Sequence, residues 1–457
     1  MNSAQIQNKA TSISLFSLKT VQMRAFHMSW FAFFLAFFGW FGIAPLMVIV
    51  RDDLGLTKTQ IGNTIIASVA VTIVARLVIG WLSDRIGPRR AYTWLLIVGS
   101  IPVMGIGLAQ NYESFLLFRL AIGVIGASFV ITQYHTSVMF APNIVGTANA
   151  TTAGWGNLGG GVTQMVMPLL LAGVLMFGVG ETIGWRLAMV VPGVALFITG
   201  IAYARFTKDA PDGNFDELRA RGDLAPVEAT KGSFREAASD PRVWALFVIY
   251  GACFGIELTI NNVAALYYHD HFNLSVGMAG LIAGLFGLMN LFARTLGGAF
   301  GDLAGVRFGL RGRVLFLGVV LCLEGIALMV FSRMDVLLLA IPAMIVFSIF
   351  VQMSEGATFS VVPFVNRRAL GSVAGIVGAG GNAGAVAAGF LFRAESITTQ
   401  DAFLFLGGFV VLVSSLVLVV RFAPEVEAEE RGRMLEALAA RHGAVPVPVT
   451  IEGSARG

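Results

Sequence analysis

Hydrophobic residues run along this chain in long unbroken stretches that short polar segments separate. Each stretch approaches the roughly 20 residues that a helix needs to cross the hydrocarbon core of a bilayer. The stretches do not alternate with a period of two, as the strands of a membrane barrel do, so the pattern predicts helices. We expect about twelve membrane spans of this length. They are predicted at residues 27–50, 60–83, 91–109, 112–140, 146–178, 183–206, 241–268, 275–302, 312–333, 335–360, 369–394 and 401–422.

The composition agrees with an integral membrane protein. Of 457 residues, 56% are hydrophobic and 13% are charged, and the mean hydropathy is +0.78. Soluble domains carry about 25% charged residues. The polar start, residues 1–24, lacks a short apolar core followed by a small-residue cleavage site, so we expect the first span to stay in the mature protein.

The longest interior polar segment, residues 207–242, divides the predicted spans into six and six. It is interpreted as a cytoplasmic linker between two halves, and the stretch PEVEAEERGRMLEALAARHGA after the last span predicts a short amphipathic helix. The expected organisation is an N-terminal segment 1–26, a six-helix bundle 27–206, a linker 207–240, a second six-helix bundle 241–422 and a tail 423–457.

Basic residues are concentrated in alternate loops. The net charge of +4 is compatible with nucleic-acid binding, but an alternation of this kind is typical of cytoplasmic loops in membrane proteins. We therefore expect no nucleic-acid partner and place both chain ends in the cytoplasm. The two cysteines, Cys253 and Cys322, fall inside predicted spans and suggest neither a disulfide framework nor a metal site.

Two motifs occur twice. The segment ARLVIGWLSD, Ala75 to Asp84, returns as ARTLGGAFGD, Ala293 to Asp302, in the second and eighth spans. The segment GWGNLGGG at residues 154–161 is echoed by GAGGNAGA at 378–385, in the fifth and eleventh spans. This repeat predicts an all-α integral membrane protein with twelve transmembrane helices in two pseudo-symmetric six-helix bundles. In such folds the substrate site lies near the membrane centre between the halves.

The repeated motif places an arginine, Arg76 or Arg294, deep in each span. A buried arginine costs about 3 kcal/mol or more and does not escape by deprotonation. A structural interpretation pairs it with Asp84 or Asp302, but each lies eight residues away, more than two helical turns; a carboxylate on another helix is the other structural option. In the functional interpretation the two arginines face each other and bind a small planar oxyanion, which suits their hydrogen-bonding edges.

The glycine-rich motifs each add one amide, Asn157 or Asn382, which can donate a hydrogen bond without adding charge. The neighbouring Gly156 and Gly381 allow close helix packing or the approach of backbone to a ligand. Both interpretations stay open from the sequence.

Other ionisable residues lie inside predicted spans. Glu257 is a candidate for proton coupling, with pairing to an arginine or a place beside a water-filled vestibule as alternatives. His135 is a second candidate, although a lone histidine is more often satisfied by neighbouring helices. Three further residues are interpreted as structural or gating contacts: Arg119, Glu324 and Glu355.

The segment GWLSDRIGPRR, Gly80 to Arg90, resembles the loop signature between the second and third helices of the major facilitator superfamily. GDLAGVRFGLRGR, Gly301 to Arg313, looks like the second copy with longer spacing. The resemblance implies gating residues that pair at the cytoplasmic face and bias which way a transporter opens. These are Asp84, Arg85, Arg89, Arg90 and Asp302.

Within that superfamily, AGWGNLGGGVTQ and VGAGGNAGAVAAG resemble the two signature segments of the nitrate/nitrite porter family, over about residues 27 to 422. The resemblance implies that Arg76 and Arg294 clamp the substrate. By matching position it also implies a set of residues in or near the site: Asn157, Asn382, Tyr250, Phe254, Phe129 and Phe37.

The runs ASFVITQYHTSVMF and GTANATTAGWGNLGGG are most similar to nitrate/proton symporters, including those of plants and algae, which often have a tryptophan at the position of His135. Other members exchange nitrate for nitrite. The implied function is therefore nitrate uptake across a bacterial inner membrane, with proton symport favoured over nitrite exchange and a monomer expected.

The residues alone leave other functions open. A transporter of another small anion, such as a carboxylate or cyanate, would also use paired arginines, and an anion channel would conduct without coupling. A membrane-bound sensor would bind without flux and would normally carry an effector domain. We find no pairing of a nucleophile with a base in the sequence, so an enzyme is not expected, and neither is a bound cofactor.

Overall fold

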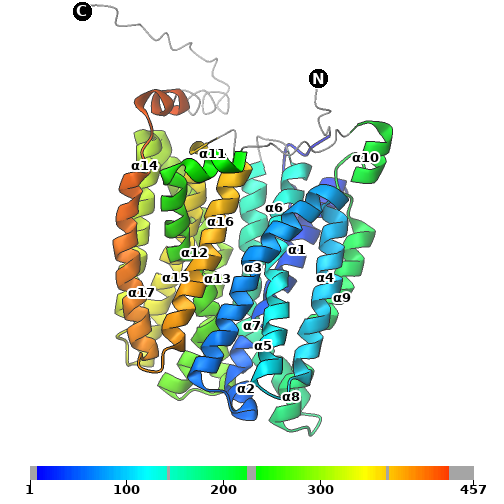
Figure 1. Cartoon of the computed structure of the whole chain (residues 1–457), viewed down its shortest axis with the longest axis vertical. Helices are drawn as coiled ribbons and strands as arrows, with labels where there is room; N and C mark the ends of the chain where they lie inside the picture. Colours follow the sequence, from blue (N-terminus) through cyan, green and yellow to red (C-terminus); the bar gives the residue numbers. More distant parts are fainter. Residues whose placement is uncertain (1–7, 141–144, 224–232, 367–369, 432–457) are drawn as a thin grey trace, which may run out of the picture.

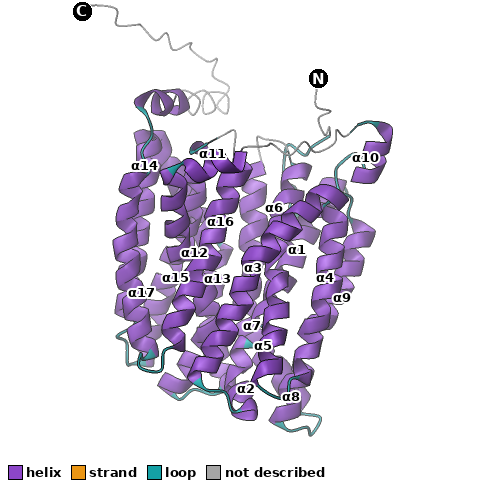
Figure 2. Ribbon diagram, in the orientation of Figure 1, coloured by secondary structure: helices purple, strands orange, loops and turns teal. Residues whose placement is uncertain are grey.

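The computed structural model describes residues 8–431, apart from 141–144, 224–232 and 367–369, and the described part is helical throughout its core (Figure 2). In Figure 1 the helices of the first half (blue to teal) and of the second half (green to red) stand side by side. The helices of the first half are α1 (Val21–Phe41), α2 (Met47–Leu54), α3 (Lys58–Ile86), α4 (Pro88–Gly105), α5 (Tyr112–Gly123), α6 (Ser128–Met139), α7 (Val145–Leu175), α8 (Glu181–Ala188) and α9 (Val190–Phe206).

Two short helices, α10 (Phe215–Arg221) and α11 (Ser233–Ser239), lie between the halves in sequence and occupy one end of the molecule, opposite α2 and α8 (Figure 1). The helices of the second half are α12 (Pro241–Phe272), α13 (Val276–Leu288), α14 (Ala293–Phe331), α15 (Leu337–Val361), α16 (Leu370–Arg393) and α17 (Thr399–Ser414). Short 3₁₀ segments continue several of them: η1 (Ala44–Leu46), η2 (Ile106–Leu108), η3 (Val124–Ala127), η4 (Met289–Leu291), η5 (Val362–Phe364) and η6 (Ser415–Val419).

The structure confirms twelve membrane passes, although two of them are joined. In the described residues, 11 helical segments are long and apolar enough to cross a membrane, and one of them, Val276–Phe331, has 56 residues. As a straight helix it would measure about 80 Å, far more than a bilayer core of about 30 Å. It is broken at Gly309, whose φ of 72° lies in the left-handed region that glycine adopts readily. This segment therefore supplies both the eighth and the ninth passes.

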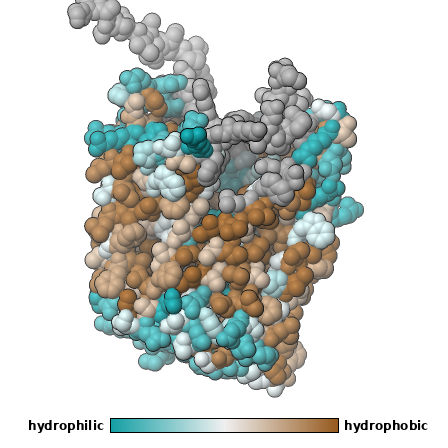
Figure 3. All heavy atoms as spheres, in the orientation of Figure 1, coloured by the Kyte–Doolittle hydropathy of each residue, from teal (hydrophilic) through white to brown (hydrophobic). Residues whose placement is uncertain are grey.

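The outer surface has the composition expected for contact with lipid. Figure 3 shows a broad apolar band with hydrophilic residues gathered at the two ends of the molecule. Large side chains exposed on this surface include Val74, Trp94, Ile101, Leu169 and Leu412. An exposed apolar band of this extent is suited to contact with the hydrocarbon of a bilayer.

The halves meet closely along two pairs of helices, where α3 packs against α16 and α7 against α13. Small residues permit this approach: a Cβ atom at Gly161 of α7 would lie 2.6 Å from the Cα atom of Gly287 in α13. Close backbone contact through small residues is the usual way in which membrane helices associate. The site described below lies at this junction.

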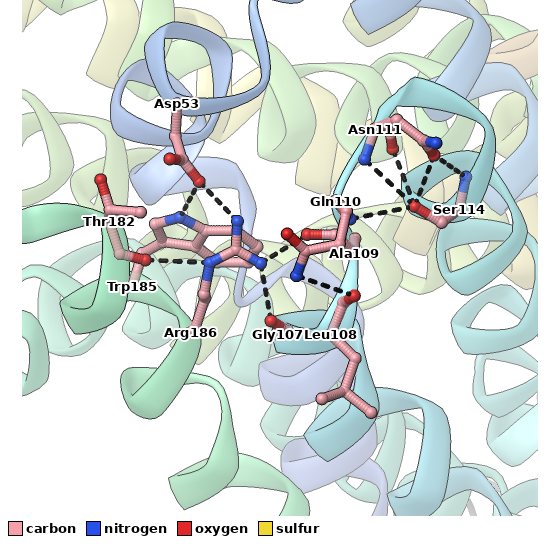
Figure 4. Close-up of polar contacts among 10 residues, drawn as sticks. All are labelled: Asp53, Gly107, Leu108, Ala109, Gln110, Asn111, Ser114, Thr182, Trp185 and Arg186. Carbon is pink, nitrogen blue, oxygen red and sulfur yellow. Dashed lines mark hydrogen bonds and ion pairs between the residues drawn. The ribbon is translucent and has the colours of Figure 1, made fainter.

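One polar cluster ties α8 to the neighbouring ends of the first half (Figure 4). Nη2 of Arg186 lies 2.8 Å from Oδ2 of Asp53, and Nη1 and Nε donate to the carbonyl oxygens of Gly107 and Thr182 at 2.7 and 3.0 Å. The indole N–H of Trp185 donates to the same carboxylate oxygen at 3.0 Å. One arginine therefore joins the start of α8 to Asp53 of α2 and to the chain between α4 and α5.

We expect Arg186→Ala to destabilise the protein by about 3 kcal/mol, because breaking a largely buried ion pair by removing one partner leaves the other charge uncompensated. Thermal unfolding in detergent, followed by tryptophan fluorescence, should show a Tm several degrees below that of the wild type. Arg205→Ala is the control, since Arg205 is an exposed arginine at the end of α9. Equal Tm values for the two variants would show that the cluster adds no stability.

Candidate anion-binding site

Arg76 of α3 presents a free hydrogen-bonding edge inside the protein. Its guanidinium group lies over the rings of Phe129 and Phe254, at 5.4 and 5.8 Å from the ring centroids, and Nη1 donates to the carbonyl oxygen of Gly378 at 3.2 Å. Nε and Nη2 are buried and have no hydrogen-bond partner in the described part of the chain. These two N–H groups form the edge with which arginine binds oxyanions in a bidentate manner.

Arg294, at the start of α14, is by contrast engaged on both terminal nitrogens. Nη2 donates to the hydroxyl oxygen of Tyr250 at 3.0 Å, and Nη1 lies 2.5 Å from Oε2 of Glu355 on α15. The Glu355 side chain is fully buried and that of Arg294 is 8% exposed. A carboxylate on another helix thus accompanies Arg294, while Arg76 has no such ion pair among the described residues. The repeated motif is symmetric in sequence but asymmetric in its contacts.

An aromatic pair on α12 connects the two arginines. Tyr250 and Phe254 are one turn apart, and their rings stack at 5.2 Å with an interplanar angle of 12°. Tyr250 contacts Arg294, and Phe254 lies beneath Arg76. The two cations, from opposite halves of the protein, therefore flank one stack of rings.

The first half supplies a second aromatic wall. The Phe129 ring on α6 lies 5.7 Å from Phe33 of α1, which in turn lies 4.6 Å from Phe37. Phe33, a residue that the sequence reasoning missed, thus connects Phe37 to Phe129. The spacing of Phe33 and Phe37, four residues apart on one helix face, does not single them out, because Phe34 and Phe38 share it.

The two signature glycines serve to admit these rings. A Cβ atom at Gly156 would lie 1.8 Å from Cδ1 of Phe33, and one at Gly381 would lie 2.3 Å from Cδ1 of Phe254. Each glycine therefore packs against an aromatic ring at the site. Of the two interpretations that the sequence left open, this arrangement favours packing over direct backbone contact with a ligand.

The signature asparagines carry unpaired polar atoms. Asn382 is fully buried, and neither its Nδ2 nor its Oδ1 atom has a partner in the described residues. Asn157 donates from Nδ2 to Glu257 Oε2 at 3.5 Å, and its Oδ1 has no partner there either. A buried polar group left unpaired costs about 1–3 kcal/mol, so these atoms are available to hydrogen-bond a further group.

Glu257 lies on α12 three residues after Phe254, and its side chain is fully buried. Its Oε1 accepts a hydrogen bond from Asn290 Nδ2 at 2.6 Å, and its carboxyl group neighbours that of Glu355. It is thus held by amides rather than by a direct ion pair with an arginine, and it adjoins the group that pairs with Arg294.

His135 belongs to a different network. Its Nε2–H group donates to the carbonyl oxygen of Lys208 at 2.7 Å, and Nδ1 accepts from the Tyr203 hydroxyl at 2.5 Å. The Tyr203 oxygen accepts in turn from Ser29 at 2.9 Å. A neutral tautomer satisfies all these contacts, which join α6, α9 and α1 and do not reach the arginines.

The predicted gating residues of the first half anchor the chain that follows α9. The backbone N–H of Arg89 donates to Asp209 at 2.8 Å, and its Nη1 donates to Asn214 at 2.9 Å, while Arg90 pairs with Asp216. Burial raises the pKa of the Asp209 carboxyl group, and its hydrogen bond from the Arg89 backbone partly opposes that rise. These contacts stay within the first half and the chain after it.

In the second half, Asp302 pairs with Arg313 across the break at Gly309, which holds the two parts of α14 together. The side chains of Asp84 and Arg85 fall outside the described ones.

Polar contacts between the halves also occur at the end of the molecule that carries α2 and α8 (Figure 1). Arg51 Nη1 lies 2.7 Å from Asp270 Oδ2, and the Thr59 hydroxyl donates to Glu395 at 3.0 Å. A cavity of about 340 Å³ lined by Arg51, Asp270 and His271 lies beside them. At this end the two halves are bridged.

Twelve membrane passes in two halves, with buried cations and unpaired amides where the halves meet, define a membrane transporter of small solutes. The sequence model of the Major Facilitator Superfamily matches residues 29–389. The chain is 39% identical to "High affinity nitrate transporter 2.5" of Arabidopsis thaliana, over 92% of this chain and 83% of the relative, and 38% identical to "High-affinity nitrate transporter 2.3" of Oryza sativa subsp. japonica, over 91% and 80%. The chain belongs to the nitrate/nitrite porter family of this superfamily.

Other comparisons agree. A relative from Picosynechococcus, "Nitrate/nitrite transporter NrtP", is 30% identical over 79% of this chain and 83% of its own. Among solved structures, a bacterial homologue of the human lysosomal transporter Spinster, described as inward-facing and unoccupied, superposes with a TM-score of 0.68 at 17% identity, over 89% of this chain and 99% of that one. At that identity the likeness establishes the fold alone.

Proposed function

We propose that this protein takes up nitrate across the cytoplasmic membrane of a bacterium. The observation that carries the proposal is the buried, unpaired Nε and Nη2 edge of Arg76, together with the unpaired amide of Asn382. Nitrate is planar, carries one negative charge and accepts hydrogen bonds on all three oxygens. It therefore matches a guanidinium edge and an amide donor better than a bulkier anion does.

In this proposal each half contributes one cation. Arg76 binds two nitrate oxygens side by side, Arg294 neutralises the opposite side, and Asn157 and Asn382 shape the remaining hydrogen bonds. The stack of Tyr250 and Phe254 limits the size of the anion. The names of the plant relatives support nitrate as the substrate.

Transport then occurs by alternating access, in which the halves rock about the central site. The bridges at the end of α2 and α8 fit a state closed on that side. Basic residues are abundant at the opposite end, in the segments around α10 and α11, which supports a cytoplasmic location for that end and for both termini.

Nitrate entry needs a driving force, because an inside-negative potential opposes it by about 2.3 kcal/mol per charge per 100 mV. We propose proton symport, with the proton site among the buried carboxyl groups beside Arg294, the group to which the sequence candidate Glu257 belongs. The second candidate is exchange of nitrate for internal nitrite, which the printed name of the cyanobacterial relative supports.

The decisive experiment measures nitrate uptake by the purified protein in proteoliposomes. Vesicles are empty or loaded with nitrite, with or without an imposed inward proton gradient. Symport predicts that the proton gradient drives nitrate uptake into empty vesicles. Exchange predicts nitrate uptake only into nitrite-loaded vesicles. Absence of nitrate uptake in every condition would refute nitrate transport and favour another anion.

A further inference from the structure

The ion pair between Arg294 and Glu355 raises a question that the nitrate site alone does not answer. Glu355 is fully buried on α15, and its Oε2 atom lies 2.5 Å from Nη1 of Arg294. This carboxylate occupies the face of Arg294 that an anion would use. Glu355 already neutralises the charge of Arg294, so a nitrate ion has to displace Glu355 or share the cation with it.

We propose that Glu355 is the internal counter-ion of Arg294, that nitrate replaces it there, and that Glu355 takes up the co-transported proton as it leaves the arginine. The inference rests on the proposed nitrate site. In the exchange, the ion pair at Nη1 passes from Glu355 to a nitrate oxygen. One proton from the aqueous phase forms an O–H bond on the freed carboxylate, so anion and proton enter together.

The charges around Glu355 explain why the proton is needed. The ionisable groups that face it are Arg294 and Glu324 on α14 and Tyr250, Cys253 and Glu257 on α12. Two of these neighbours are carboxyl groups, and Arg294 is the cation that Glu355 contacts in the described structure. If nitrate took Arg294 without a proton, Glu355 would remain as a buried carboxylate without its cation, beside other acids. Such uncompensated burial is strongly unfavourable.

Glu257 is less suited to this role, although the sequence singled it out. Both of its oxygens accept amide hydrogen bonds, from Asn290 at 2.6 Å and from Asn157 at 3.5 Å. Neither amide belongs to the Arg294 contact that nitrate would replace. Glu257 therefore does not lose its cation on nitrate binding, whereas Glu355 does.

The test is nitrate affinity of the full-length protein in detergent as a function of pH, measured by isothermal titration calorimetry. If one proton is taken up with each nitrate, linkage weakens binding by up to about tenfold for each unit that the pH rises. For Glu355→Gln we expect an affinity that changes less than about threefold over the same range, because the glutamine neither competes as an anion nor takes a proton. The matched control is Glu324→Gln, which removes a neighbouring buried carboxyl group that forms no ion pair with Arg294 in the described structure; it should keep the wild-type pH dependence.

A second measurement uses the unaltered protein, in case Glu355→Gln does not fold. Binding enthalpies in buffers of different ionisation enthalpy give the number of protons taken up per nitrate, and we expect a value near one. A value near zero in the wild type, or wild-type pH dependence in Glu355→Gln, overturns the role of Glu355 while leaving nitrate binding intact. If the wild-type protein did not bind nitrate at any pH, the proposed function itself would be refuted. In proteoliposomes, Glu355→Gln should retain nitrate exchange and lose gradient-driven accumulation.

Discussion

Arg76→Lys is expected to weaken nitrate binding about 100-fold or more. Lysine keeps the positive charge but loses the planar edge formed by Nε and Nη2, the two donors that lack a protein partner in the described structure. Two hydrogen bonds from a charged group contribute about 1.5 kcal/mol or more each, which together corresponds to about two orders of magnitude in Kd. We expect Arg294→Lys to lose binding as well, since it disturbs the contacts to Tyr250 and Glu355.

Calorimetric titration of nitrate into each purified variant checks this expectation. Arg205→Lys is the matched control, because Arg205 is an exposed arginine in the last turn of α9 and its variant should bind like the wild type. Monodisperse elution and an unchanged Tm show that each variant is folded. Wild-type affinity in both Arg76→Lys and Arg294→Lys would rule out the two-arginine clamp.

Gly381→Ala is expected to reduce nitrate transport at least tenfold. The added methyl group would lie 2.3 Å from the Phe254 ring, which stacks on Tyr250 and lies beneath Arg76. Overpacking of this kind costs about 1–3 kcal/mol and is relieved by moving the ring. Moving Phe254 displaces the surface between the two arginines, so the defect should appear in affinity as well as in stability.

The same helix offers the control for this substitution. A Cβ atom at Gly375 of α16 has no heavy atom within 4 Å, so Gly375→Ala should transport nitrate at the wild-type rate. Initial uptake rates in proteoliposomes at several nitrate concentrations separate an affinity defect from a loss of active protein. If the two variants behaved alike, the close contact of Gly381 with Phe254 would not matter for transport.

The fold class was accessible from the sequence because lipid imposes a simple rule. A helix that satisfies its own backbone must present about 20 apolar residues to cross the bilayer, and this length is visible in a single chain. The boundaries were less accessible. The first predicted span, 27–50, corresponds to α1, a 3₁₀ turn and α2, because hydropathy does not distinguish one straight helix from a bent one. The joining of the eighth and ninth passes through Gly309 was missed for the same reason.

The repeated motifs also pointed to the residues that meet at the site. Arg76 and Arg294 were singled out because a permanent cation in an apolar helix requires compensation, and this holds whatever the fold. The interpretation of the glycines stayed open, because a glycine that admits a ring and one that admits a ligand have the same sequence. Phe33, which packs against Gly156, was not distinguishable from the other phenylalanines of α1.

By itself the sequence determined that this protein is a multi-pass helical membrane protein with an internal repeat and two buried arginines, and its motifs identified the family. Only the tertiary structure decided that Arg294 pairs with Glu355 rather than Asp302, that Arg76 keeps a free edge, and that His135 is tied to Tyr203. The physical reason is that contacts between helices depend on the rotation and tilt of each helix. Those quantities are set by packing over the whole bundle, and the spacing of residues along one helix does not contain them.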